Sequence, residues 1–231
     1  MAEKIKENGF DSLACNYDKT IPAHVARHYL EKRVDFIKGV LKSGSILDVG
    51  CGTGALALRL AGEGYEVSGV DASLGMLREC VKKGFSRVSH AESGKMPFAP
   101  GSFDLVMSVA AFHHLGSREN VAAAIAEMFR VCRPGGKILV WDNNPLNPYW
   151  KIFMKRLPWD DGVERLVPAR EICAALRSAG GENIRLYRLG FVADFIPRAL
   201  LPVMKSVEEA LERLPGARNL AAHNVILADK L

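Results

Sequence analysis

The sequence predicts a doubly wound α/β fold, with a mostly parallel sheet and helices on both of its faces. Short apolar stretches with strand character alternate with amphipathic stretches of helical length, which is the order that βαβ units produce. A glycine-rich turn at residues 50–54 follows the first strand and opens a helix, and Asp71 ends the second strand. Ligands of such sheets bind beyond the carboxyl ends of the strands, so functional residues are expected directly after strands.

The individual elements are placed by apolar periodicity and by helix-stop signals. The expected strands cover residues 45–49, 66–71, 103–108, 137–141, 184–189 and 225–228. The expected helices run from Pro22 to the stop at Ser43-Gly44, from about Thr53 to Ala61, from an N-cap at Ser73 to Gly84, from Ser117 to the breaker Arg133-Pro134-Gly135-Gly136, and from Pro168 to Ala179. A further short helix is expected to begin at a capping box formed by Ser206 and Glu209 and to stop at Pro215-Gly216.

The bulk composition is that of a single globular domain. The chain has 231 residues, of which 48% are hydrophobic and 25% charged. One domain is expected over residues 1–231, with an N-terminal helical cap (1–43), a cofactor-binding core (44–142) and substrate-side elements with the last strands (143–231). No apolar stretch approaches the roughly 20 residues of a membrane-spanning helix. Residues 1–7 are charged, unlike a signal peptide, so a cytoplasmic location is expected.

The cysteines, histidines and charges count against a disulfide-rich protein, a metal site and a nucleic-acid-binding protein. The five cysteines are scattered without a CxxC pair, so neither a disulfide framework nor a metal site is expected. His24 and His28 lie four apart but adjoin no glutamate, and we expect them on a packed or solvated helix face. The net charge of +5 is dispersed, so no nucleic-acid partner is expected, while attraction to anionic substrates or lipid stays open. The sequence predicts no particular oligomeric state.

The glycine-rich turn indicates a nucleotide site. The sequence Asp48-Val49-Gly50-Cys51-Gly52-Thr53-Gly54-Ala55 places glycines where the backbone must turn tightly and where a ligand can approach the main chain. Asp71 lies 17 residues beyond Gly54 (71 − 54), close to the spacing of a carboxylate that binds ribose hydroxyls. The turn also satisfies the dinucleotide pattern G-x-G-x-x-A, so the residues alone leave a nicotinamide cofactor open.

Four segments, taken together, carry a family resemblance. They are Ile46–Gly54, Gly69–Leu77, Met96–Val106 and Glu127–Lys137, within a matching region of about residues 10–142. In these segments the chain resembles the class I S-adenosylmethionine-dependent methyltransferases, and among them the small-molecule enzymes like methyltransferase type 11. The resemblance implies a Rossmann-like sheet with an antiparallel last strand. It also implies S-adenosylmethionine as the cofactor and S-adenosylhomocysteine as the product.

The same resemblance implies a cofactor site. Asp48 is expected near the methionine end of the cofactor, and Asp71 at its ribose. Ala91-Glu92 stands where the family contacts adenine; the family often has Asp first, so Ala91 implies contact through backbone groups. Tyr17 resembles a tyrosine that closes over the cofactor, although helix packing explains it equally well. The full expected set is Tyr17, Asp48, Gly50, Cys51, Gly52, Gly54, Asp71, Ala72, Met76, Ala91, Glu92 and Ser108.

Two histidines are the candidate catalytic residues. Methyl transfer is a displacement at a sulfonium methyl group, so the protein mainly aligns the acceptor with that group in a water-poor pocket. A general base is needed only where the acceptor arrives protonated. His113 and His114 follow the strand at residues 103–108, on the edge that faces the substrate in this family. The competing interpretation is that they hydrogen-bond the backbone.

The acceptor is expected to be a small molecule, apolar or anionic, methylated on O, N or C. Residues 108–111 are Ser-Val-Ala-Ala, where DNA and protein-glutamine methyltransferases generally carry Asn/Asp-Pro-Pro-Tyr/Phe. Residues 142–150 read as a loop that bears on substrate choice. Residues 191–204, which we name the wall segment, are apolar at ten of fourteen positions and are interrupted by Pro197 and Pro202. We expect a mobile wall over an apolar acceptor, with core packing as the competing explanation.

The sequence as a whole predicts an S-adenosylmethionine-dependent methyltransferase. One alternative is an NAD-dependent oxidoreductase, against which the missing second nucleotide-binding half counts. The other is a cofactor-binding domain without catalysis that acts as a sensor or scaffold. This alternative stays open because binding residues and catalytic residues are largely separate.

Overall fold

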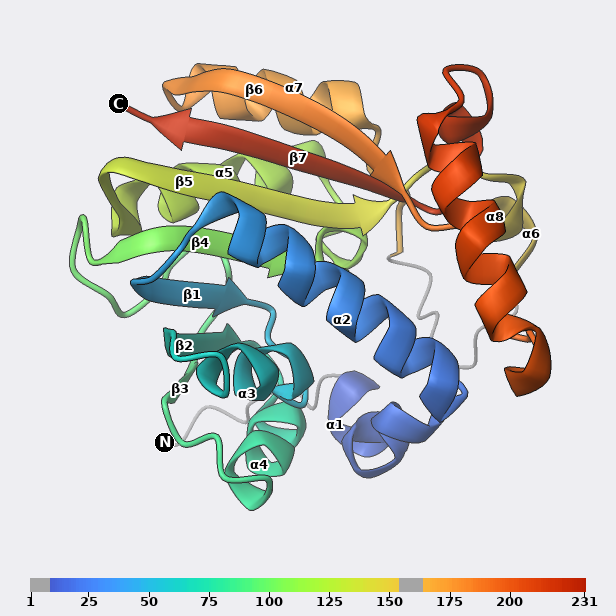
Figure 1. Cartoon of the computed structure of the whole chain (residues 1–231). Coiled ribbons are helices and arrows are strands. Elements are labelled where there is room, and N and C mark those ends of the chain that lie inside the picture. Colours follow the sequence, from blue (N-terminus) through green and yellow to red (C-terminus); the bar gives the residue numbers. More distant parts are fainter. Residues whose placement is uncertain (1–8, 154–163) are drawn as a thin grey trace.

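A seven-stranded sheet forms the centre of the computed structural model, which describes residues 9–153 and 164–231 (Figure 1). The strand order is β3-β2-β1-β4-β5-β7-β6. The strands are β1 Ser45–Val49, β2 Glu66–Asp71, β3 Val88–His90, β4 Phe103–Val109, β5 Cys132–Asn143, β6 Gly181–Leu189 and β7 His223–Lys230.

The pairing pattern is that of a doubly wound sheet. β1 pairs in parallel with β2 on one side and with β4 on the other, and β3 and β5 extend the two halves in parallel. β7 lies between β5 and β6 and runs antiparallel to both. The predicted fold class is confirmed, including the antiparallel last strand. The strand order reverses between β1 and β4, so the carboxyl ends of these strands mark the expected ligand site.

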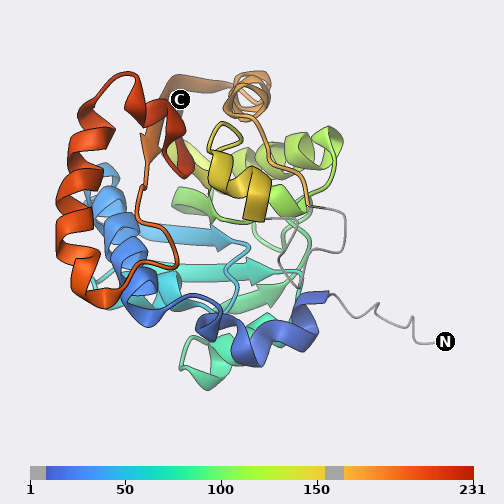
Figure 2. The ribbon, with the colours of Figure 1, turned by 90° about the vertical axis from the view of Figure 1, so that its right-hand side faces the viewer.

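Helices cover both faces of the sheet. They are α1 Gly9–Leu13, α2 Ala23–Val40, α3 Ala55–Ala61, α4 Leu74–Lys82, α5 Arg118–Val131, α6 Pro148–Phe153, α7 Ala169–Ser178 and α8 Leu201–Arg213, with short 3₁₀ helices at Ala14–Lys19, Phe112–His114, Arg198–Leu200 and Ala217–Leu220. One apolar core joins α5 and α7 to the sheet, and a second joins α2, α3 and α4 to the opposite face. Figure 2 shows α2 and α5 on opposite sides of the strands.

Local chemistry accounts for the helix starts. The hydroxyl of Ser73 accepts the backbone N–H of Met76 at 3.1 Å, and the hydroxyl of Ser117 accepts that of Asn120 at the same distance. Each bond satisfies one of the N–H groups that a first helical turn leaves unpaired. The predicted N-cap at Ser73 and the predicted start at Ser117 are therefore confirmed.

The capping box predicted at Ser206 and Glu209 is wrong, since both residues lie inside α8. The helix begins at Leu201, and Pro202 falls in its first turn. A proline there loses no intrahelical hydrogen bond and already has the helical φ angle, so it starts the helix instead of interrupting it.

The breaker at residues 133–136 ends α5 as predicted, but it belongs to β5, which already begins at Cys132. The register between β4 and β5 shifts there, from Phe103 paired with Cys132 to Leu105 paired with Lys137. The proline and glycines are therefore accommodated in an irregular stretch of the strand pair.

The described residues contain no helix that is long and apolar enough to cross a membrane. Residues 1–8, on which the expectation about a signal peptide depends, lie outside the described part of the chain. The division into cap, core and substrate-side elements stays a prediction.

Candidate active site

Two adjoining cavities lie beyond the carboxyl ends of β1 and β4. The larger measures about 780 Å³ and the smaller about 200 Å³. Both are lined by Tyr17, Gly50, Gly52 and His114, so these residues stand where the two spaces meet. The position is the switch point at which a doubly wound sheet binds its ligand.

The glycine-rich turn forms the floor of this junction. Gly50, Gly52 and Gly54 have φ angles of +75°, +54° and +77°, in the left-handed region that favours glycine. A Cβ atom at Gly50 would lie 2.6 Å from the Cβ of Ala111, so the turn has no room for a side chain there. The backbone N–H groups of Gly50 and Cys51 donate to the carbonyl of Val70, which holds the turn against β2.

Asp71 closes the smaller cavity. One carboxylate oxygen accepts the N–H of Gly52 at 2.8 Å, and the other accepts the N–H of Ser73 at 2.8 Å. Each oxygen retains a further lone pair for a ligand. Burial raises the pKa of Asp71 above its ordinary value, although these backbone bonds oppose the shift. Six residues of the predicted cofactor set line this cavity away from the junction: Asp71, Ala72, Met76, Ala91, Glu92 and Ser108.

The larger cavity contains a buried carboxylate and a guanidinium. Asp48 is buried at the end of β1, and burial, reinforced by the charge of Asp71, raises its pKa to about 7. Arg33 enters from α2, with its guanidinium carbon 5.9 Å from the centre of the Trp141 ring. Its Nε has no hydrogen-bond partner among the described residues, and burial lowers its pKa. Arg33 was not predicted as a site residue, because a single cation beside the apolar stripe of a helix resembles a solvated surface residue.

Tyr17 stands in the 3₁₀ helix that precedes α2, where it lines both cavities. Burial raises the pKa of its hydroxyl. Cys51 lines the larger cavity. Gly54 lines neither cavity. Instead it lies against Cys80 and Phe85, where an added Cβ would come within 3.0 Å of the Cys80 sulfur, so its role in the turn is conformational.

His113 and His114 form the short 3₁₀ helix after β4, and each faces a carboxylate. His113 Nδ1 lies 2.6 Å from a carboxylate oxygen of Asp142, which is buried near the end of β5. Burial lowers the pKa of His113, but the charge and hydrogen bond of Asp142 outweigh it and raise the pKa above its usual value. His114 Nδ1 lies 3.2 Å from Glu164. The competing interpretation was that these histidines hydrogen-bond the backbone. It does not hold for His113 Nδ1, whose partner is the side chain of Asp142.

Neither carboxylate was predicted to be a partner of the histidines. The position of Asp142 in the sequence was informative, because it follows an expected strand at the edge of the sheet where functional residues gather. Glu164 carried none, since it lies 50 residues beyond His114 (164 − 114) in a segment without periodicity.

The far side of the larger cavity is held by hydrogen bonds between chain segments. Trp150 Nε1 donates to the carbonyl of Ala222 at 2.6 Å, and the amide of Asn147 donates to the carbonyl of Leu220 at 2.7 Å. The Tyr149 hydroxyl donates to Asp194 at 2.7 Å. The loop predicted over residues 142–150 is therefore only partly correct, because residues 142–143 end β5 and residues 148–150 begin α6. The hydrogen bonds fix this segment to the residues before β7 and after β6.

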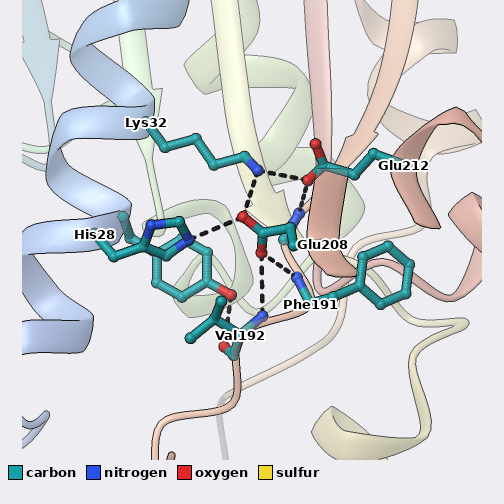
Figure 3. A network of polar contacts seen from close by, with 8 residues as sticks. His28, Lys32, Phe191, Val192, Glu208 and Glu212 are labelled. Atoms are coloured by element: carbon teal, nitrogen blue, oxygen red, sulfur yellow. Dashed lines mark hydrogen bonds and ion pairs between the residues drawn. The ribbon is translucent and has the colours of Figure 1, made fainter. Parts of the chain in front are cut away.

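A buried glutamate anchors the start of the wall segment (Figure 3). The Glu208 side chain is 1% exposed, and its carboxylate accepts from His28 at 2.8 Å and from Lys32 at 2.6 Å. It also accepts the backbone N–H groups of Phe191 and Val192 at 2.5 and 3.1 Å. These partners lower the pKa of Glu208 to about 2, against the opposing effect of burial. Glu208 thereby joins α8, α2 and the cavity wall.

Only part of the wall segment faces the larger cavity. Residues 191–194 line it, whereas Phe195 is 69% exposed and Leu200 and Val203 also point to solvent. His24 Nε2 lies 2.7 Å from the carbonyl of Ile196, which attaches the segment to α2. His24 and His28 therefore contact different partners, in agreement with the packed helix face expected from the sequence.

The sheet order, the glycine turn and the paired cavities define a Rossmann-like nucleotide-binding protein. A family model described as a methyltransferase domain matches residues 47–140. The fold is shared with an S-adenosylmethionine-dependent methyltransferase of Thermotoga maritima, at a TM-score of 0.71 and 19% identity over 96% of this chain and 99% of that one. The matched region is thus a methyltransferase domain, in agreement with the predicted family and with S-adenosylmethionine as its cofactor.

The chain matches some curated relatives over most of their length and others over a small part of it. It is 26% identical over 218 residues to the demethylmenaquinone methyltransferase of Tropheryma whipplei, covering 83% of this chain and 89% of that protein. It is 28% identical over 146 residues to the tRNA (carboxymethyluridine(34)-5-O)-methyltransferase alkbh8 of Xenopus tropicalis, covering 59% of this chain and 22% of that protein. A relative from Encephalitozoon cuniculi that is named as a methyltransferase is also matched over only part of its length, 43%.

Proposed function

We propose that this protein transfers a methyl group from S-adenosylmethionine to a small-molecule acceptor. The observation that carries the proposal is the junction of two cavities at the glycine turn. A cofactor in the smaller cavity would present its sulfonium methyl group to the larger one. Alignment of two reactants in such a pocket is the main contribution that a protein makes to a displacement reaction.

The smaller cavity suits the adenosine half of the cofactor. Asp71 would accept hydrogen bonds from the ribose hydroxyls through its remaining lone pairs, while Ala91 and Glu92 would flank the adenine. Met76 and Ala72 complete an apolar boundary for the ring. The glycines at 50 and 52 allow the ligand to approach the main chain.

The methionine end of the cofactor carries an ammonium and a carboxylate, and the larger cavity has a group of opposite charge for each. Asp48 would face the ammonium group, whose charge favours the ionised form of a carboxyl with a raised pKa. Arg33 would face the carboxylate, since its Nε has no hydrogen-bond partner in the described part of the chain. Tyr17 would close over this end from the N-terminal side.

The remaining space of the larger cavity would take the acceptor. Trp150, Tyr149 and Phe191 give this space an aromatic side, and His113 and His114 stand at its junction with the cofactor site. A small molecule fits this enclosure better than a nucleic acid, whose recognition needs a clustered basic surface. A relative that covers most of both chains is named for demethylmenaquinone, whereas the match to the tRNA enzyme spans 22% of that enzyme's length. We therefore retain a small-molecule acceptor.

We assign the catalytic step to the histidine pair. The attacking atom forms a bond to the methyl carbon while the bond from sulfur to that carbon breaks, and S-adenosylhomocysteine leaves. An acceptor that carries a proton must lose it in the same reaction, and the imidazoles are placed to assist that loss. The hydrogen bond that His113 Nδ1 donates to Asp142 fixes the orientation of His113 for this task. The presence of this pair favours an enzyme over a binding domain without catalysis.

Asp71→Ala is expected to weaken the binding of S-adenosylhomocysteine by about 1.5–3 kcal/mol, the range for losing a hydrogen bond to a charged group. Isothermal titration calorimetry measures this change directly. Asp35→Ala, an exposed aspartate on α2, is the matched control and should leave the affinity unchanged. Unaltered binding by the Asp71 variant would show that Asp71 does not hold the ribose.

A further inference from the structure

Three side chains that can bind a metal converge beside the larger cavity, which two of them line. They are His113, His114 and Glu164, and their candidate ligand atoms all lie within 4.8 Å of one another. The two histidines come from the 3₁₀ helix after β4, while Glu164 comes from the segment before α7. Since these positions are far apart in the sequence, no local metal motif marks them, and this explains why no metal was expected.

Glu164 is the informative member of the group. Its side chain is 3% exposed, yet neither carboxylate oxygen has a hydrogen-bond partner among the described residues. The neighbouring cation does not serve it, because Arg165 pairs with both oxygens of Glu171 at 2.9 and 2.7 Å. A buried carboxylate without hydrogen bonds is costly and calls for a missing partner.

The separations suit two ligands of a single cation. His114 Nδ1 and the nearest Glu164 oxygen are 3.2 Å apart, without the orientation of a hydrogen bond. Two ligand atoms about 2.1 Å from one ion, with an angle of about 100° between them, are about 3.2 Å apart. All three candidate ligand atoms lie within 4.8 Å of one another, so a side-chain rotation brings the third atom to the separation of about 3.4 Å found between ligands of a tetrahedral ion.

His113 is already oriented as a metal ligand. Asp142 occupies its Nδ1 at 2.6 Å, which leaves Nε2 as the free nitrogen. Histidines that bind metals almost always have their other ring nitrogen on a carboxylate, a carbonyl or water, and that partner fixes the tautomer. Asp142 is buried and has this relation to His113.

We propose that His113, His114 and Glu164 bind a divalent transition-metal ion whose open coordination positions face the larger cavity. Two imidazoles and one carboxylate favour Zn²⁺, Mn²⁺, Fe²⁺ or Co²⁺ over Mg²⁺ and Ca²⁺, which prefer all-oxygen sites. The ion binds the oxygen of a hydroxylated acceptor, a consequence that rests on the proposed methyl transfer. The oxygen gains the methyl group, the bond from sulfur to carbon breaks, and the hydroxyl proton passes to solvent.

Cobalt is the probe for this site because its visible absorption reports coordination by protein ligands. The full-length protein is stripped with a chelator, dialysed and titrated with Co²⁺ in the absence of cofactor and acceptor. We expect saturation at one ion per chain, displacement by Zn²⁺ and a raised melting temperature with either ion. Glu164→Gln and His114→Ala should each weaken Co²⁺ binding at least tenfold, because even the loss of a residue that hydrogen-bonds a metal ligand costs about 10–100-fold in affinity.

Two exposed residues supply the matched controls, Glu66→Gln and His90→Ala, which should bind Co²⁺ like the parent protein. Circular dichroism and S-adenosylhomocysteine binding of each variant verify that it is folded. Absence of Co²⁺ and Zn²⁺ binding by the parent, or binding that persists in both ligand variants, overturns the proposal. If the parent binds S-adenosylhomocysteine but no ion, the metal site fails alone. If it binds the ion but not S-adenosylhomocysteine, the proposed function fails alone.

Discussion

Replacement of both His113 and His114 by alanine is expected to lower methyl transfer by about 10²–10⁴-fold, the contribution of positioned acid–base groups. The loss should appear in kcat, because the pair stands where the two cavities meet and its replacement leaves intact the residues that line the rest of the smaller cavity. The expectation holds whether the imidazoles act on the acceptor proton directly or through a bound ion. Release of S-adenosylhomocysteine under saturating cofactor is the measurement.

The single variants and a control separate catalysis from folding. His90→Ala removes an exposed histidine outside both cavities and should retain full turnover. Asp142→Asn should behave like His113→Ala, because it removes the charge that orients His113. The double variant should bind S-adenosylhomocysteine as the parent does. If cofactor affinity and turnover fall together, the histidines maintain the structure of the site and the assignment is wrong.

Glu208→Ala is expected to lower the free energy of unfolding by about 3–5 kcal/mol, the cost of breaking a buried ionic network by removing one partner. The variant leaves His28 and Lys32 without their shared carboxylate and frees the backbone N–H groups of Phe191 and Val192 (Figure 3). Urea denaturation followed by circular dichroism measures the change. A loss of this size is a large fraction of the stability of an ordinary domain.

Glu209→Ala is the control for this prediction, since Glu209 follows directly in α8 but is exposed. It should change stability by less than about 0.5 kcal/mol. The pKa of Glu208 is about 2 in the folded protein against 4.5 for the free side chain. The stabilisation is therefore fully present above pH 4.5 and is lost as the pH falls towards 2. Equal stability of the two variants would show that the network contributes nothing.

The parts of the fold that the sequence predicted are those governed by local chemistry. The apolar strands β1 and β2 and the capped start of α4 have signals within a few neighbouring residues. The three-residue strand β3 was missed, because so short a segment has no measurable periodicity. The start of α8 was misplaced because Ser206 and Glu209 match a capping motif inside a helix that begins earlier.

The residues of the candidate site likewise separate into those with a local signal in the sequence and those without one. The glycine turn and Asp71 are marked by spacing, and the structure places them at the cavity junction and the smaller cavity. Arg33, Glu164 and Glu208 gave no signal, because their roles depend on burial and on partners far away in the sequence. Long-range contacts of this kind arise only after the helices have packed on the sheet.

Calorimetric titration of the purified chain with S-adenosylhomocysteine and, separately, with NAD distinguishes a methyltransferase from an NAD-dependent oxidoreductase. Both ligands contain adenosine, but only the former carries the amino-acid end that we propose Asp48 and Arg33 bind through opposite charges. The account predicts saturable one-to-one binding of S-adenosylhomocysteine and no heat of binding with NAD. Binding of NAD with no binding of S-adenosylhomocysteine would contradict it.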